Sequence, residues 1–562
     1  MTRILIFLFC LCVIASACGA EPLLPTTAAQ AGSPTAGTVT RPAAEATPTL
    51  SPTVRATEVE PSATPTTAPP ATPAPWRVGI EPGVPADLVS AARGLLESQA
   101  ETFVLATGDE PADVTLRVER GEPLATWIYA VVAPFATLDE ATTLSDLQAN
   151  WRNGAAPQAL VDESGEQLLT SAWGEGAAQQ VDSEALVAEL WRQRPAWSVL
   201  PFHRLDPSLK VLSVDGVSPM DETFDAATYP LTFSVGLEGD AEAVAALRDA
   251  WLGPLTNRDE AHITRLAMTG VTALVRATAY QMEIRGLSYP GEEVATVLQG
   301  ADLAHASNEI SFVPDCPPPH YIGEPVFCSS PRYLALLQEI GIDVVELTGN
   351  HLNDWGAQYV PYTLDLYDEA GMRYFGGGRN LAEAQEPLTL EHNGNRLAFA
   401  GCNPVGPAGG WAAAQRAGSA PCEGDAFRAQ IGALREGGYV VIATQQYQEL
   451  YHYAPTAQQR ADFRALAEAG AAAVSGSQGH HAQGFDFHAG AFIHYGLGNL
   501  FFDQMDMLGT RQTMVDIYTI YENRLLNVQM WTGLIENYAR PREMSVEERR
   551  DLLQTLFDAS GW

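Results

Sequence analysis

Short hydrophobic runs alternate with amphipathic stretches along most of the chain after residue 75. Runs of this length between turn residues predict buried strands, and apolar positions three and four apart predict helices. In the first half, strands are predicted at 126–133, 197–202 and 209–214, and a helix at 184–192. Strands that alternate with helices in this way predict an α/β fold.

The second half continues the alternation and adds two hairpins. Strands are predicted at 263–270, 342–347, 439–444 and 473–474, and helices at 332–340, 361–370, 456–471 and 545–559. One hairpin turns at Asn393-Gly394, because Asn-Gly favours the positive φ angles of a tight turn, and the other at Ala489-Gly490. This order predicts an α-β-β-α sandwich of two sheets flanked by helices.

The periodicity breaks between residues 255 and 262, and the chain is too long for one domain. We therefore predict two folded domains, at 76–255 and 262–540, and a C-terminal helix at 541–562.

The N-terminal segment has a different composition. Met1-Thr-Arg3 precedes an apolar stretch too short to span a bilayer comfortably, and Ala15-Ser-Ala-Cys18 follows. Residues 1–18 resemble a bacterial lipoprotein signal peptide in which Cys18 carries the lipid. An ordinary secretory signal stays the alternative, because Ala15 stands where leucine is usual. Residues 19–75, rich in Thr, Pro, Ala and Ser, are predicted to be a disordered tether.

The net charge is −36, and Lys210 is the single lysine. Nucleic acids and anionic lipids require basic patches, so this composition excludes nucleic acid as a partner and leaves the lipid as the link to the membrane. It also argues against tight binding of polyglutamate.

Four cysteines remain after Cys18: Cys316, Cys328, Cys402 and Cys422. An even number in an exported chain predicts two disulfides. Sequence does not fix the pairing, but we prefer the local pairs 316–328 and 402–422. Zinc binding is the alternative, and the lack of a Cys-x-x-Cys pair argues against it.

The segment Glu346-Leu-Thr-Gly-Asn-His-Leu-Asn-Asp-Trp-Gly356 carries the chemistry. An apolar strand that stops at Gly349 places Asn350 and His351 at the carboxyl edge of a sheet, where α/β proteins bind ligands. With Asp354, these side chains suit a divalent-metal phosphoesterase centre. A turn in which Asn and Asp only cap a following helix is the alternative.

Asn350-His-Leu-Asn-Asp-Trp-Gly356 resembles the Asn-His-x-x-Asp-x-Gly motif of the CapA-like poly-γ-glutamate capsule biosynthesis proteins. Three further segments resemble that family, in its order: residues 301–309, which end in Asn308-Glu309, residues 371–384, and residues 495–504. The resemblance implies a calcineurin-like metallophosphoesterase fold over about 262–540, with Glu309, Asn350 and His480 as metal ligands and His351 and Asp354 as catalytic residues.

Three departures weaken this centre. The family's first strand ends in Gly-Asp, but here Gly270 is followed by Val271, which cannot bind metal. The family's His-Trp-Gly appears as Gln446-Tyr-Gln448, and its Gly-His-His-Pro-His as Gly476-Ser477-Gln-Gly-His480. A rival register aligns Gly479-His-His481 with the last motif, and we prefer the first because it needs no gap before Asn499. The positions of Val271, Gln446 and Ser477 are therefore degenerate ligand positions.

Two functional hypotheses follow. In the first, the protein is an enzyme that holds one divalent ion (Mn, Mg or Zn) and hydrolyses or transfers a phosphate ester or γ-glutamyl group, with His351 as proton donor. In the second it binds no metal, and it is a non-catalytic surface protein that binds an anionic polymer or a small molecule. Both place it outside the bacterial cytoplasmic membrane or at the cell surface, anchored by lipid.

The first domain also resembles a known class. Ala130-Val-Val-Ala-Pro134, Trp151, Val214-Asp-Gly-Val-Ser-Pro219 and Tyr229-Pro-Leu231 are similar to segments of type-2 periplasmic solute-binding domains. The resemblance implies a ligand cleft in this domain, and an α/β scaffold without a ligand remains the alternative.

Overall fold

The computed structural model describes residues 74–107, 110–322 and 326–562. The predicted signal peptide, the lipid site at Cys18 and nearly all of the tether lie outside these residues. Within the described ranges, no helix combines the length and apolar character needed to cross a bilayer.

The first sheet is built only from strands that precede residue 240, and its main path has the order β2-β1-β3-β10-β4-β8-β6-β7. Its long central strand β4 is buried over most of its length. The strands are β1 (Trp76–Ile80), β2 (Phe103–Leu105), β3 (Val114–Val118), β4 (Glu122–Pro134), β5 (Ala141–Thr142), β6 (Gln158–Val161), β7 (Gln179–Gln180), β8 (Ala196–Pro201), β9 (Leu209–Val214) and β10 (Thr232–Gly239). The helices are α1 (Ala86–Ser98), α2 (Leu144–Asn153), α3 (Glu163–Trp173), α4 (Leu186–Arg192) and α5 (Ala241–Ala250).

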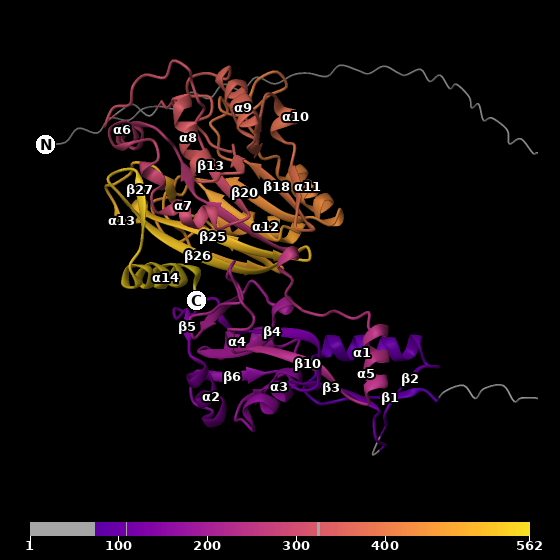
Figure 1. Cartoon of the computed structure of the whole chain (residues 1–562). Coiled ribbons are helices and arrows are strands. Elements are labelled where there is room, and N and C mark those ends of the chain that lie inside the picture. The colour runs from indigo at the N-terminus through magenta and orange to yellow at the C-terminus, as the bar shows by residue number, and fades with distance from the viewer. Residues whose placement is uncertain (1–73, 108–109, 323–325) are drawn as a thin grey trace, which may run out of the picture. The chain divides into compact units, whose positions relative to one another are not determined.

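A second sheet has the order β15-β14-β13-β11-β25-β26-β27, with β12 and β24 beside it. β11, β13, β14 and β15 are parallel, whereas β25 and β26 form a long antiparallel pair (Figure 1). The strands are β11 (Ile263–Thr269), β12 (Val271–Thr272), β13 (Leu303–Asn308), β14 (Val344–Glu346), β15 (Arg373–Phe375), β24 (Asn499–Phe501), β25 (Gln512–Tyr521), β26 (Arg524–Glu536) and β27 (Arg540–Glu543).

A third sheet has the order β17-β18-β20-β21-β23-β22, and β18, β20, β21 and β23 are parallel. A hydrophobic core that includes Leu266, Phe399 and Tyr518 unites residues of the second and third sheets. The strands are β17 (Leu388–His392), β18 (Asn395–Cys402), β20 (Val440–Gln446), β21 (Ala473–Ser477), β22 (Phe485–His488) and β23 (Ala491–His494).

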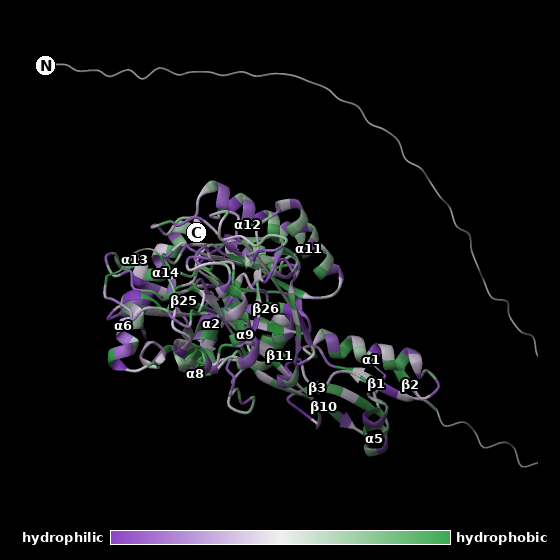
Figure 2. Cartoon of the chain, turned by 90° about the horizontal axis from the view of Figure 1, so that it is seen from above, coloured by the Kyte–Doolittle hydropathy of each residue, from purple (hydrophilic) through white to green (hydrophobic). Residues whose placement is uncertain are grey.

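Helices cover the outer faces of these two sheets. One core joins the second sheet to α6 (Arg276–Arg285), α7 (Val294–Gln299), α8 (Leu334–Glu339) and α9 (Tyr359–Ala370). Another joins the third sheet to α11 (Gly424–Glu436) and α12 (Ala457–Ala469). The helices are striped with hydrophobic and hydrophilic residues, as expected where one face is buried (Figure 2). The predicted α/β class and the α-β-β-α sandwich are confirmed.

Both predicted hairpins form. Asn393 and Gly394 have positive φ angles between β17 and β18, and so do Ala489 and Gly490 between β22 and β23.

The C-terminal segment 541–562 contains the helix predicted at 545–559, and a short strand precedes it. Its first residues form β27 at the end of the strand order, an edge position that tolerates the missing N–H of Pro541. Helix α14 (Val546–Ser560) starts only after Ser545, whose side chain accepts from the backbone N–H of Glu548 in a capping box.

Both local disulfides are present, Cys316–Cys328 and Cys402–Cys422, which confirms the preferred pairing. Each closes a loop that contacts the Asn350–Asp354 segment. The backbone N–H of Phe327 donates to Asp354 Oδ2 at 2.9 Å. In the other loop, the carbonyls of Gly409 and Ala417 accept from Asn353 Nδ2, each at 3.0 Å.

Replacing Cys402 and Cys422 together by serine is expected to lower the free energy of unfolding by about 3 kcal/mol, because the cross-link no longer restricts the unfolded chain. Urea unfolding followed by circular dichroism measures the change. Peptide mapping of the untreated protein should find all four cysteines in the two predicted pairs. Alkylation of all four in denaturant without reductant would contradict the prediction.

Candidate functional site

Polar side chains meet where parallel strands of the second and third sheets end. Glu309 follows β13, Asn350 follows β14, and Gln446 and Ser477 are the last residues of β20 and β21. All of these strands present their carboxyl ends here, which is the usual ligand edge of an α/β sheet. Hydrogen bonds link five side chains here, and His480 is close enough to act on the charge of Glu309; together they form the polar cluster of Glu309, Asn350, Gln446, Ser477, Gln478 and His480.

Gln446 is the centre of the cluster. Its Nε2 donates to Glu309 Oε1 at 2.9 Å, to Asn350 Oδ1 at 3.2 Å, and to Gln478 Oε1. Its Oε1 accepts from Ser477 Oγ at 2.7 Å. Glu309, Gln446, Ser477 and Gln478 are all buried, so these bonds form away from solvent.

Glu309 is the carboxylate of this cluster. Burial raises the pKa of Glu309, while the charges of His480 and His351 and the hydrogen bond from Gln446 act in the opposite direction. Both histidines are therefore near enough to influence this carboxylate.

His351 and Asp354 form a second unit beside the cluster. His351 Nδ1 lies 2.7 Å from Asp354 Oδ2, and the ring packs on Phe327 at 4.5 Å between ring centroids. Burial lowers the pKa of His351, but the hydrogen bond to Asp354 and the charges of Glu309 and Asp354 outweigh it, so the pKa is raised. With Nδ1 bound to Asp354, Nε2 is the nitrogen that can carry a proton towards a ligand.

His480 belongs to the cluster and its neighbour does not. His480 has a positive φ angle, its Nδ1 lies 2.7 Å from Asn499 Oδ1, and its ring stacks on Phe502. His481 instead packs against Tyr451 and Tyr453, and neither of its buried ring nitrogens has a hydrogen-bond partner.

Val271 is a fully buried strand residue of β12 that pairs with Asn499 of β24, so it adjoins the cluster without offering a donor atom. Gly270 brings the two strands together, because a Cβ there would lie 2.0 Å from the carbonyl oxygen of Gly498. A third predicted ligand position is thus occupied by an aliphatic side chain.

Sequence reasoning did not assign roles to Gln478 and Asn499, which contact Gln446 and His480. Both lie inside segments that resemble family motifs, so their positions could have indicated that they belong to the site. Asp503, in the same terminal motif, accepts from Arg276 Nε at 3.1 Å and from the N–H of Ala277 at 3.0 Å. It holds the start of α6 and does not join the cluster.

A two-metal centre does not fit this donor set. Two adjacent cations need several carboxylates and imidazoles, and the described residues contain no group of three His, Cys, Asp or Glu side chains placed to hold a metal. Asp354 is bound to His351, and amide or hydroxyl groups stand at two of the degenerate positions. We therefore assign no metal-dependent step to the site.

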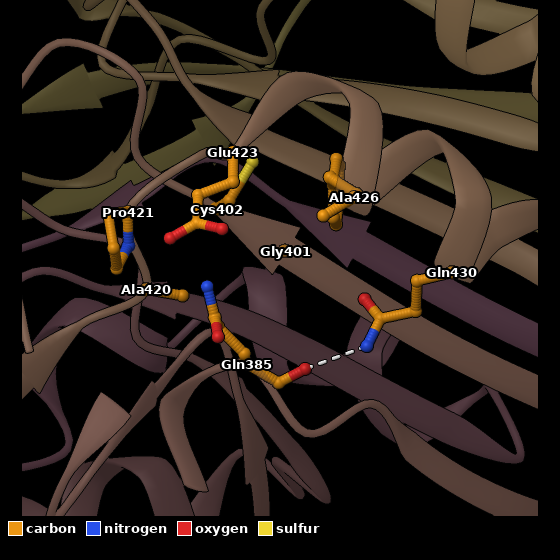
Figure 3. Close-up of a pocket in the computed structure, with 9 residues that line it drawn as sticks. Gln385, Gly401, Cys402, Ala420, Pro421, Glu423, Ala426 and Gln430 are labelled. Atoms are coloured by element: carbon orange, nitrogen blue, oxygen red, sulfur yellow. Dashed lines mark hydrogen bonds between the residues drawn. The ribbon is translucent and has the colours of Figure 1, made fainter. Parts of the chain in front are cut away.

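Two cavities lie apart from the cluster. One, of about 120 Å³, sits beside the Cys402–Cys422 disulfide, where Gln430 Nε2 donates to the carbonyl of Gln385 at 2.8 Å (Figure 3). None of its lining residues belongs to the polar cluster.

The larger cavity, of about 760 Å³, lies between the starts of α1 and α3. Arg204 lines it and donates to Asp87 Oδ1 at 2.8 Å. Hydrogen bonds from His203 and Arg204 lower the pKa of Asp87 to about 2 despite its partial burial. The cavity is lined by charged and hydroxyl side chains that include Ser90, Arg93, Asp162, Ser164, Asp182 and Ser183.

Comparison with known proteins finds similarity to capsule synthesis proteins in this region. Residues 265–504 match the family model of the bacterial capsule synthesis protein PGA_cap. The chain is 30% identical over 172 residues to the capsule biosynthesis protein CapA of Bacillus anthracis, covering 30% of this chain and 42% of that protein. It is 26% identical over 170 residues to the PGA biosynthesis protein CapA of Bacillus subtilis (strain 168), covering 30% and 45%. The matched part spans less than half the length of these relatives.

Solved structures give weaker likenesses. A possible phosphate-binding protein of Planctomyces limnophilus has 14% identity and a TM-score of 0.24, covering 29% of this chain and 80% of that chain. The NAD nucleotidase of Haemophilus influenzae has 10% identity and a TM-score of 0.31, covering 53% and 56%.

The motifs, their gathering at the strand ends and the family match agree over the same residues. Residues 265–504 of this chain match the family model of the bacterial capsule synthesis protein PGA_cap and are similar to two CapA proteins, so this region is CapA-like.

Proposed function

We propose that this protein acts in the biosynthesis of a capsular or other cell-envelope polymer of the poly-γ-glutamate type, outside the bacterial cytoplasmic membrane. The observation that carries the proposal is the convergence of Glu309, Asn350, His351 and His480, all from family motifs, on one edge of the sandwich. A lipid on Cys18 and the 19–75 tether would hold the site near the membrane surface.

The geometry favours binding over metal-assisted hydrolysis. The cluster has a single carboxylate, Glu309, and its remaining oxygen atoms are neutral. His351 is held by Asp354 and has a raised pKa, so it offers Nε2 as a hydrogen-bond donor to a carbonyl or anionic oxygen of a bound polymer. The role we infer for the site is to hold a polymer segment loosely, because the net charge of −36 opposes tight binding of an anionic polymer.

A second candidate function is solute binding by the first domain, which the 760 Å³ cavity favours. A cavity of this size matches the pockets that hold small molecules, and its lining carries both arginine and carboxylate groups. Under this alternative the protein would bind a small polar solute at the cell surface.

Deleting the gene in its own bacterium is expected to reduce the polymer retained at the cell surface. Cell-bound and released polymer are measured by size-exclusion chromatography, and samples in which the polymer has been hydrolysed serve as controls. Complementation with the wild-type gene should restore the bound fraction, and a Cys18→Ala variant should restore it only weakly because the protein is no longer anchored. Unchanged bound and released polymer in the deletion strain would refute the proposed function.

A further inference from the structure

The amide nitrogen of Gln446 lies at the point on which three oxygen atoms converge. Glu309 Oε1, Asn350 Oδ1 and Gln478 Oε1 come from three different segments, and all three lie within hydrogen-bond distance of this one nitrogen and share its two hydrogens. A carboxylate and two amide oxygens aimed at one point are the donor types that a hard divalent cation binds.

The orientation of this amide follows from its partners. Ser477 Oγ donates to Gln446 Oε1 at 2.7 Å, so the oxygen faces Ser477 and the nitrogen faces the carboxylate. The reverse orientation would place the amide oxygen against Glu309, Asn350 and Gln478 and leave a buried carboxylate without a donor, which is costly. The NH₂ group, with its partial positive charge, is therefore the complementary group at this point.

We propose that the side-chain amide of Gln446 takes the place of a cation in this chain, so that Glu309, Asn350 and Gln478 are satisfied from within and the cluster excludes divalent metal. This proposal shares one assumption with the proposed function, which is that the polar cluster is the functional site. It also implies that the oxygen ligands persist and that removing the amide opens a cation site.

The surroundings support this assignment. Gln446 is fully buried at the end of β20, and Val271 next to the cluster offers no further ligand. A divalent ion bound to the same oxygens would have to stand where the amide is, because oxygen–metal distances are about 2.0–2.6 Å. The amide and the ion therefore compete for one position.

The test compares thermal unfolding of the full-length protein with and without MnCl₂, after metal has been removed by chelation. A concentration of about 1 mM MnCl₂ is far above that of any trace metal left in the sample. Mn²⁺ should leave the Tm of the wild-type protein unchanged. Gln446→Ala should lower the Tm in the absence of metal by roughly 5 °C, because a buried carboxylate loses its donor. Added Mn²⁺ should recover at least half of that loss.

Gln445→Ala is the matched control. Gln445 is the preceding buried residue of the same strand, and its Nε2 contacts Cys402 Sγ and Cys422 Sγ, each at 3.7 Å, instead of the cluster. This variant should lose stability without any response to Mn²⁺. Gln446→Glu, which keeps the size of the side chain, covers the case in which the alanine variant fails to fold, and it should gain Mn²⁺-dependent stabilisation.

A rise in the wild-type Tm of several degrees with Mn²⁺, or about one equivalent of metal in wild-type protein purified without chelator, would overturn the proposal. So would equal responses of Gln446→Glu and Gln445→Ala. These results would leave the polymer function standing, because polymer retention is measured separately in cells.

Discussion

Asp516→Ala is expected to lower the free energy of unfolding by about 1–3 kcal/mol, because it leaves the buried ring of His494 without its hydrogen-bond partner. His494 Nδ1 lies 2.7 Å from Asp516 Oδ2, and both side chains are fully buried. The pair joins β23 of the third sheet to β25 of the second. Without Asp516, the histidine would keep a buried polar ring with no partner at Nδ1.

An exposed pair of the same type is the control. His488 Nε2 lies 2.8 Å from Glu468 Oε1 near the surface, where water can replace either partner. Glu468→Ala should therefore change the free energy of unfolding by less than about 1 kcal/mol. Replacing His494 and Asp516 together by leucine should restore most of the stability lost in the single variant. Chemical denaturation measures all three, and equal losses for Asp516→Ala and Glu468→Ala would contradict the argument.

Much of the fold could be predicted because local signals and tertiary structure agree. Asn393-Gly394 specifies a turn with positive φ angles, and the turn is present. Ser545 and Glu548 mark the start of the last helix, and they form its capping box. In each case the physical cause acts within a few residues, so periodicity and turn chemistry locate the element.

The candidate site was predictable in part for a similar reason. The strand that ends near Gly349 places Asn350 and His351 at a sheet edge, and Asp354 lies within reach of His351 in the same short segment. The contacts of Gln446 were not predictable, because its partners Glu309 and Gln478 are brought together by separate strands. The sequence predicts a degenerate ligand position at Gln446, and the structure adds the hydrogen bonds that its amide makes.

The packing of Phe135 is another feature that the sequence could not reveal. It directly follows β4 of the first sheet, yet it belongs to the hydrophobic core of the sandwich. Its ring contacts five aromatic rings at centroid distances of 5.2–6.2 Å, those of Phe485, Phe487, Phe492, Phe557 and Trp562. The predicted strand at 126–133 ends before Phe135, and hydrophobic periodicity does not specify the core to which this residue contributes.

Phe135→Ala is accordingly expected to lower the free energy of unfolding by about 3–5 kcal/mol, because it leaves a cavity in a cluster that cannot easily collapse. Phe103→Ala is the control, since Phe103 is equally buried but packs in the core of the first sheet. Both variants should be destabilised, and only Phe135→Ala should show a coupling energy with Trp562→Ala, of about 0.5–1.5 kcal/mol.

Limited proteolysis adds a second measurement to the same variant. If Phe135 ties the first sheet to the sandwich, its removal should speed cleavage between residues 255 and 262, where the hydrophobic pattern breaks, more than Phe103→Ala does. A destabilisation below about 1 kcal/mol, or no coupling with Trp562, would show that this ring contributes little to the joint core. The two-domain prediction would then gain support, because residues 76–255 and 262–540 would unfold independently of each other.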